Sequence, residues 1–179
     1  GDVPENNRRN LWAKAELHCA KYCLESAAYI SQGKLDWHLG IHNYDLRYGE
    51  NPYQSKAAFF ASKSNDSLQI ASFDLLSGQP SYVNLTSLDE LVTILTRLTG
   101  AFSTNFNGKT PLIAIGSKHG IPVGVGIDWD SPERALTKML WGDPKVIWGG
   151  EVIVNFPISG NWVELLISDP LRFDLYGSE

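Results

Sequence analysis

The feature that most constrains the fold is a seven-residue apolar run, PLIAIGS, from Pro111 to Ser117. It lies between two stretches with helical periodicity, residues 86–100 and residues 131–142. A run this short is typical of a strand buried in a core, whereas a buried helix needs about ten residues or more. This alternation of helix and strand predicts one layered α/β domain over residues 1–179.

The ends of these two helices are marked by capping residues. Thr86 or Ser87 can cap the first helix, and Gly100 is expected to end it. In the second helix Ser131 is the expected cap, and Pro132 occupies the first helical position, where a missing N–H costs nothing.

Other segments follow the same logic. Strands are expected at residues 56–62, 68–76 and 151–156, where apolar residues alternate or cluster between turn residues. Residues 118–128 are rich in glycine and proline and predict a loop with one short strand. The last residues, 158–179, form a C-terminal extension with one apolar segment.

Near the N-terminus, residues Asn7 to Ser31 predict a long helix with Asn6 or Asn7 as its cap and Gly33 just beyond its end. Its apolar residues recur at helical spacing: Leu11, Leu17, Ala20, Leu24, Ala27 and Ala28.

Cys19 and Cys23 lie four residues apart in this helical pattern. The spacing suits a metal ligand pair, but no second pair or histidine cluster completes a site. Two buried or half-buried thiols are therefore favoured over a metal site, and both interpretations fit a reducing compartment.

Charge and hydropathy exclude several classes of function. The net charge is −5 and the 15 basic residues are scattered, so nucleic acid is not the expected partner. No stretch of about 18 apolar residues predicts a membrane span, and the polar N-terminal residues lack the apolar core of a secretory signal. These features predict a cytoplasmic protein.

The segment DLRYGENPYQ, residues 45–54, places several side chains that can bind a ligand in a tight turn. Arg47 offers a fork of donors that matches phosphate oxygens, and Tyr48 adds a hydroxyl or a ring face. Gly49 permits positive φ and close backbone approach, while Asn51 before Pro52 is held in a turn. The alternative is a surface loop whose arginine pairs with a carboxylate.

Lys118 and His119 directly follow the buried apolar run. A histidine at a strand end can move a proton near neutral pH, and a neighbouring lysine can stabilise negative charge on oxygen. The alternative is a solvated Lys-His pair in a turn, and spacing alone does not separate the two.

Between the second helix and the last strand lies GDPKVIWGG, residues 142–150. Its glycine pair permits close backbone approach. Trp148 can stack on a flat ring, although an indole is more often part of a core.

Four motifs in the same order resemble those of the AICAR transformylase domain of the bifunctional purine-biosynthesis enzyme. They are LRYGENPYQ at Leu46–Gln54, SYVN at Ser81–Asn84, KHGIPVG at Lys118–Gly124 and DPKVIWGG at Asp143–Gly150. The resemblance covers residues 8 to 157. Tyr53 stands where that family usually has histidine.

The resemblance implies a cytidine-deaminase-like layered α/β/α fold, with a mixed sheet, flanking helices and no zinc. The chain agrees on the last point, because it lacks both His-x-Glu and Pro-Cys-x-x-Cys. The resemblance also implies transfer of a formyl group from 10-formyltetrahydrofolate to an amine of AICAR (5-aminoimidazole-4-carboxamide ribonucleotide) or a related small acceptor.

By position in these motifs, the resemblance assigns roles to individual residues. Arg47 and Tyr48 would hold the substrate phosphate, and Asn84 would orient the carboxamide. His119 would accept a proton from the attacking amine, and Lys118 would stabilise the oxyanion or the leaving folate. The remaining substrate-binding positions would be Gly49, Pro122, Gly124, Trp148 and Gly149.

Two departures from the family bear on function. The resemblance covers about half of the family's two-lobed domain, so a homodimer is expected to supply the second lobe. Val146 and Ile147 replace small, hydroxyl-bearing residues, which puts the identity of the acceptor in doubt. Two further interpretations stay open: a non-catalytic nucleotide- or folate-binding module, and a hydrolase that releases formate from the folate.

Overall fold

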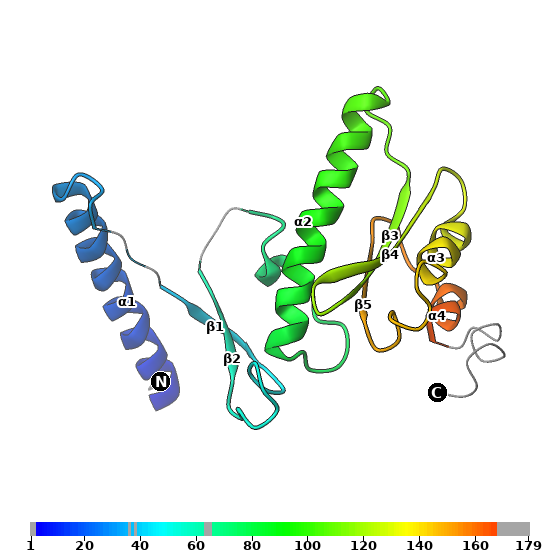
Figure 1. The fold of residues 1–179 in the computed structure, drawn as a ribbon. Helices are drawn as coiled ribbons and strands as arrows, with labels where there is room; N and C mark the ends of the chain where they lie inside the picture. The colour runs from blue at the N-terminus through cyan, green and yellow to red at the C-terminus, as the bar shows by residue number, and fades with distance from the viewer. Residues whose placement is uncertain (1–2, 36, 38, 63–65, 168–179) are drawn as a thin grey trace. The chain divides into compact units, whose positions relative to one another are not determined.

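The computed structural model describes residues 3–35, 37, 39–62 and 66–167 (Figure 1). The described chain divides into two compact units. The first comprises the residues up to Ile41 together with residues 61–62, and the second comprises residues 42–60 and the chain from Asp66 onward.

The first unit is built on helix α1, Glu5–Ile30, which confirms the long helix expected from the sequence. Its cap is Pro4, which makes no side-chain hydrogen bond, so the expected asparagine cap is wrong. The expected glycine end is confirmed: Gly33 has a φ of 75°, and its N–H donates to the carbonyl of Ala28 at 2.9 Å.

Helix α1 has no buried residue, although its apolar residues recur at helical spacing. Leu11 and Trp12 are 61% and 68% exposed. Cys19 and Cys23 are both exposed, which contradicts the expectation of buried or half-buried thiols. The helical spacing of these apolar residues therefore predicted the helix but not their burial.

The second unit includes most of a two-stranded sheet of β1, Ile41–Asp45, and β2, Ala58–Ala61, whose end residues Ile41 and Ala61 are counted in the first unit. The strand expected at residues 68–76 is wrong, because a short 3-10 helix, η1, occupies Ile70–Ser72. The carboxylate of Asp66 accepts from the N–H of Leu68 at 2.8 Å, and such local turn bonding competes with strand formation.

A second sheet has the order β4-β3-β5, with β3 at Leu112–Lys118, β4 at Ile121–Asp128 and β5 at Glu151–Val154. Strands β3 and β5 confirm expected strands, whereas β4 is much longer than the short strand expected there. Both pairings are antiparallel among the described strands, where a mixed sheet was expected.

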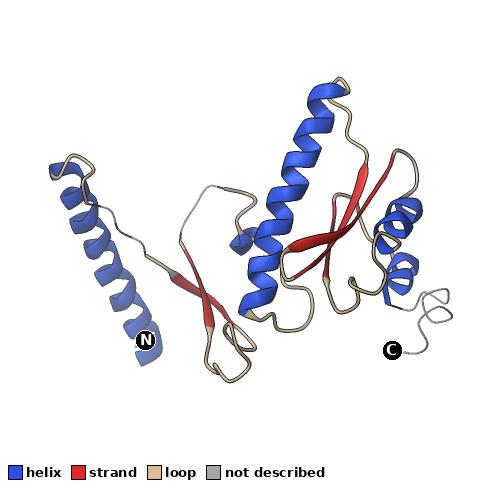
Figure 2. Cartoon of the chain, in the orientation of Figure 1, coloured by secondary structure: helices blue, strands red, loops and turns tan. Residues whose placement is uncertain are grey.

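Three helices cover this sheet, as Figures 1 and 2 show. Helix α2, Tyr82–Asn105, packs on one face through a cluster of Leu91, Ile113 and Ile115. Helices α3, Pro132–Leu140, and α4, Gly160–Ile167, pack on the other face, where the core is formed by Ala114, Ala135, Leu136, Met139, Leu140, Ile147 and Phe156.

Helix α2 begins earlier and ends later than its sequence pattern indicated. Ser81 is the N-cap, and its side chain and that of Asn84 bond each other's backbone N–H in a capping box. The caps expected at Thr86 or Ser87 are therefore wrong, and Gly100 lies inside the helix instead of ending it.

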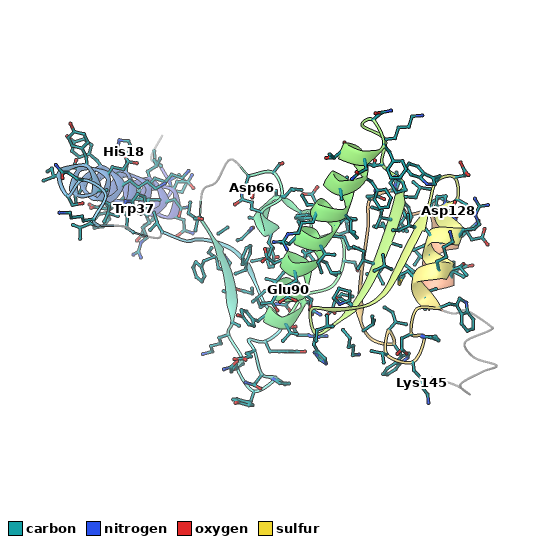
Figure 3. The ribbon with its side chains drawn as sticks, turned by 45° about the horizontal axis from the view of Figure 1, so that its top comes forward. His18, Trp37, Asp66, Glu90, Asp128 and Lys145 are labelled. Atoms are coloured by element: carbon teal, nitrogen blue, oxygen red, sulfur yellow. The ribbon has the colours of Figure 1, made fainter. Side chains whose placement is uncertain are left out.

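Helix α3 has the expected cap, because the Ser131 side chain accepts from the N–H of Arg134. The buried carboxylate of Asp128, at the end of β4, connects this strand to the helix (Figure 3). It accepts from Arg134 Nη2 at 2.8 Å and from Lys138 Nζ at 2.9 Å. Hydrogen bonds from Arg134, and then from Lys138, hold the pKa of Asp128 well below its usual range.

Replacing Asp128 tests this connection between β4 and α3. Because the folded-state pKa is lowered, the carboxylate stabilises the fold above its unfolded pKa and loses that effect as the pH falls below about 4. We expect Asp128→Asn to lower the melting temperature at pH 7, with the difference from wild type shrinking below about pH 4.

The matched control is Asp130→Asn, whose 85% exposed carboxylate lies 3.6 Å from the same arginine. Exposed pairs contribute little, so this variant should melt close to wild type. Equal losses in the two variants, or a pH-independent loss in Asp128→Asn, would contradict the assigned role.

Candidate functional site

The segment that carries Arg47 and Tyr48 is attached to the start of α2. The N–H of Arg47 donates to the carbonyl of Pro80 at 2.9 Å, and the N–H of Tyr82 donates to the carbonyl of Tyr48 at 3.1 Å. These two backbone bonds fix the arginine and the tyrosine beside Ser81, the cap of the helix.

The side chains of this segment interact with each other. The guanidinium of Arg47 lies 4.9 Å from the centre of the Tyr48 ring, and Nη2 donates to the Tyr48 hydroxyl at 3.3 Å. A hydrogen bond with Ser81, and then the one from Arg47, lower the pKa of Tyr48. In the described part of the chain Arg47 makes no ion pair, so its exposed charge is not neutralised by a carboxylate there.

Gly49 lies in the turn and does not adopt the positive φ that a glycine permits. Its N–H donates to the carbonyl of Gln54 at 3.0 Å, and a Cβ at Gly49 would meet the Gln54 side chain. The turn around Asn51 is confirmed by a bond from the N–H of Gln54 to the Asn51 carbonyl at 2.9 Å. The group that comes close to the backbone of Gly49 is thus the Gln54 side chain, whereas the sequence suggested a ligand.

Asn84 uses most of its hydrogen-bonding capacity within the protein. Its Oδ1 accepts from the N–H and the hydroxyl of Ser81, and its Nδ2 donates to Glu151 Oε1 at 3.1 Å. One N–H of the amide has no further bond to described residues. Sequence reasoning missed Glu151, which opens β5 and pairs with Ser117 of β3. The sequence feature that could have identified Glu151 is its position as a lone charged residue at the start of an apolar strand.

Lys118 and His119 lie where β3 turns into β4. His119 and Gly120 have φ values of 52° and 76°, and Lys118 pairs with Ile121 across the turn. Two central residues with positive φ are typical of the tight turns that join antiparallel strands. The turn leaves the His119 side chain exposed at the end of the hairpin.

A carboxylate from α2 lies against this turn. A Cβ built on Gly120 would overlap the side chain of Glu90, so the glycine leaves room for that carboxylate (Figure 3). Sequence reasoning also missed Glu90, which reads as an ordinary solvated helix residue.

Lys118 reaches the loop before β5. Its Nζ donates to the carbonyl of Trp148 at 2.7 Å and lies 3.3 Å from where a Cβ of Gly149 would be, and Gly149 has a φ of 65°. Trp148 is 60% exposed, so the interpretation of this residue as core is wrong. Its neighbour Ile147 is buried instead.

Pro122 and Gly124 lie within β4. Pro122 is exposed and pairs with Ser117 at a register shift. Gly124 faces α3, where a Cβ would overlap the backbone carbonyl of Met139. The structure therefore gives Gly124 a packing role between strand and helix.

Contacts thus connect the predicted site residues through the first turns of α2. Tyr48 bonds Ser81, Ser81 bonds Asn84, and Asn84 bonds Glu151. Glu151 pairs with Ser117, next to Lys118. Arg47, Tyr48, Asn84, Lys118 and His119 all lie on segments that contact the N-terminal half of α2 or belong to it.

Among the described residues, no group of three or more histidine, cysteine, aspartate or glutamate side chains could hold a metal ion. No helix in the described ranges is long and apolar enough to cross a membrane.

The sheet, its helices and this site define an α/β protein with a strand-turn Lys-His pair. Its sequence matches the family described as AICARFT/IMPCHase bienzyme over residues 1–169. The chain belongs to this family.

Curated relatives agree with this assignment. The chain is 30% identical over 178 residues to the bifunctional purine biosynthesis protein PurH of Bacillus thuringiensis (strain Al Hakam), and equally to that of Bacillus cereus (strain AH187). PurH of Bacillus cytotoxicus is 30% identical over 173 residues. These matches cover 93% of this chain and 31% of each relative, so the chain spans about a third of their length.

Replacing Gly124 separates packing from ligand binding. Because a Cβ would overlap a helix backbone carbonyl, which cannot rotate away, we expect Gly124→Ala to lower the free energy of unfolding by about 1–3 kcal/mol. Urea unfolding measures the loss.

The matched control is Gly100→Ala, inside α2, where a Cβ would meet no atom within 4 Å. That variant should be more stable than wild type by roughly 0.5–1 kcal/mol. A Gly124→Ala protein with unchanged stability but weakened substrate binding would assign this glycine to the substrate instead.

Proposed function

We propose that this chain is a folate-dependent formyltransferase lobe that uses 10-formyltetrahydrofolate to formylate the amine of AICAR or a related small acceptor. The observation that carries the proposal is the Lys118–His119 pair on a tight turn, in a chain that belongs to a family of purine-biosynthesis enzymes. The PurH relatives are named as bifunctional, and the chain spans about a third of their length, so the activity of this chain by itself is the point to be tested.

The proposed reaction is a direct acyl transfer. The acceptor amine attacks the formyl carbon and forms a C–N bond, the bond from that carbon to N10 of the folate breaks, and tetrahydrofolate leaves with a proton. His119 accepts the proton from the amine. Lys118 stabilises the negative charge on the formyl oxygen, because one bond to the Trp148 carbonyl leaves two of its N–H donors for a substrate.

The Arg47 segment suits an anionic group of the acceptor. Its guanidinium is exposed and has no carboxylate partner among the described residues, while the Tyr48 hydroxyl lies beside it. A phosphate would replace the contact with the tyrosine ring by paired hydrogen bonds, which are stronger. Asn84 can add its one remaining N–H to the carboxamide. Gly49, Pro122, Trp148 and Gly149 would shape the walls of the site.

We also propose a cytoplasmic homodimer in which the second copy provides the lobe that the longer relatives contain. The resemblance implies that the two halves of the family domain have related, deaminase-like folds, so a twofold pairing of one lobe is a natural replacement. Light scattering tests this proposal, and a fully active monomer would rule it out.

A second candidate is a nucleotide- or folate-binding module without turnover. The hydrogen bonds of Asn84 favour this second candidate, because Ser81 and Glu151 occupy three of the hydrogen-bonding positions of that side chain. An exposed Val146 and a buried Ile147 in place of hydroxyl-bearing residues also favour it.

The deciding experiment follows release of tetrahydrofolate from 10-formyltetrahydrofolate, with and without AICAR. We expect acceptor-dependent turnover that falls about 10²–10⁴-fold in His119→Asn, since general acid–base groups contribute on this scale. Lys118→Met should lower kcat, and Arg47→Ala should mainly raise KM for the acceptor. The matched control is His18→Asn, an exposed histidine on α1.

The other outcomes identify the alternatives. Binding of either ligand without turnover would support the binding module. Release of formate without an acceptor would identify a hydrolase. Turnover that is unchanged in His119→Asn would refute the proton-transfer role.

A further inference from the structure

A hollow of about 570 Å³ lies in the second unit, among the β1–β2 sheet, η1 and the first turns of α2. Leu46 and Leu85, which are each 7% exposed, supply apolar lining. This volume falls within the range of small-molecule sites in proteins. Arg47, Lys118 and His119 do not line the hollow, although Leu46 directly precedes Arg47 and Glu90 packs against the Lys118–His119 turn.

Aromatic rings form much of the wall. Phe59 and Phe60 come from β2, and Tyr82 comes from the first position of α2. Phe60 is 57% exposed and Tyr82 is 48% exposed, so neither residue is buried in the core. Aromatic faces carry negative charge density and attract cations as well as flat rings.

Two adjacent carboxylates complete the lining. Asp89 and Glu90 lie on α2 and are exposed. Neither makes an ion pair in the parts of the chain that the structure describes, so no protein cation there neutralises the two charges. The hollow therefore combines apolar lining, aromatic walls and an uncompensated negative edge.

We propose that this hollow binds a small organic cation with an aromatic body, such as an arylalkyl ammonium ion. The ring would lie among the Phe59, Phe60 and Tyr82 side chains, and the ammonium group would meet the carboxylates of Asp89 and Glu90. Charge complementarity selects the cation, because an anionic ligand would face two like charges and a neutral ligand would leave them unpaired.

Glu90 connects the hollow to the Lys118–His119 turn. The same carboxylate lies against Gly120 in the Lys118–His119 turn. A cation bound at Glu90 would thus contact a side chain that packs on the turn. The binding inference itself does not depend on the proposed reaction, and its test needs no turnover.

The experiment titrates the full chain with three probes of similar size: 2-phenylethylammonium, neutral 2-phenylethanol and anionic 3-phenylpropanoate. Calorimetry and ligand-observed NMR measure binding. We expect the cation to bind at least about tenfold more tightly than the alcohol, and the anion to bind most weakly. In Asp89→Asn/Glu90→Gln the cation should fall to the affinity of the alcohol, while the alcohol is unaffected.

The matched control is Glu25→Gln/Glu133→Gln, which changes the net charge equally at exposed positions outside the hollow. It should leave the cation's affinity unchanged, whereas a general charge effect would weaken binding in both double variants and overturn the proposal. Equal affinity for all three probes, or no binding of the cation, would also overturn it. A dimer that dissociates in Phe60→Ser, with no probe bound by wild type, would identify the occupant as a second copy.

Discussion

The packing of α2 across β3 and β5 is the constraint on which the second unit depends. Leu91 meets Ile113 and Ile115 on that face, and the helix has to start at a defined point for these contacts to form. The capping box of Ser81 and Asn84 sets that point. It satisfies backbone N–H groups that would otherwise lack partners, and it simultaneously connects the helix to β5 through Glu151.

The N-terminal half of the same helix holds the segments that carry the candidate site residues. The Arg47 segment bonds to residues 80–82, while the Lys118–His119 turn lies against Glu90 two turns farther along the helix. Groups that are far apart in sequence are thereby held on rigid elements, which is what precise positioning of a substrate requires. The side chain of Asn84 serves structure and, in our proposal, recognition, and the structural bonds limit what it can offer a ligand.

Much of the fold could be predicted from local patterns. Helices α1 and α3 and strands β3 and β5 have the expected types, because caps, glycines and apolar periodicity act over a few residues. The strand expected at residues 68–76 failed because Asp66 bonds its local backbone. Strand β4 was underestimated because its glycines suggested a loop, although Gly124 is needed for close packing under α3.

The sequence by itself determined the α/β character, the order of the main elements and the candidate residues Arg47, Tyr48, Lys118 and His119. Each of these depends on short-range chemistry or on a motif that can be read along the chain. Only the tertiary structure decided that Gly124 packs against a helix, that Trp148 is exposed and that Glu90 and Glu151 belong beside the site. Those facts depend on which segments meet across the sheet, and no local pattern encodes such long-range pairings.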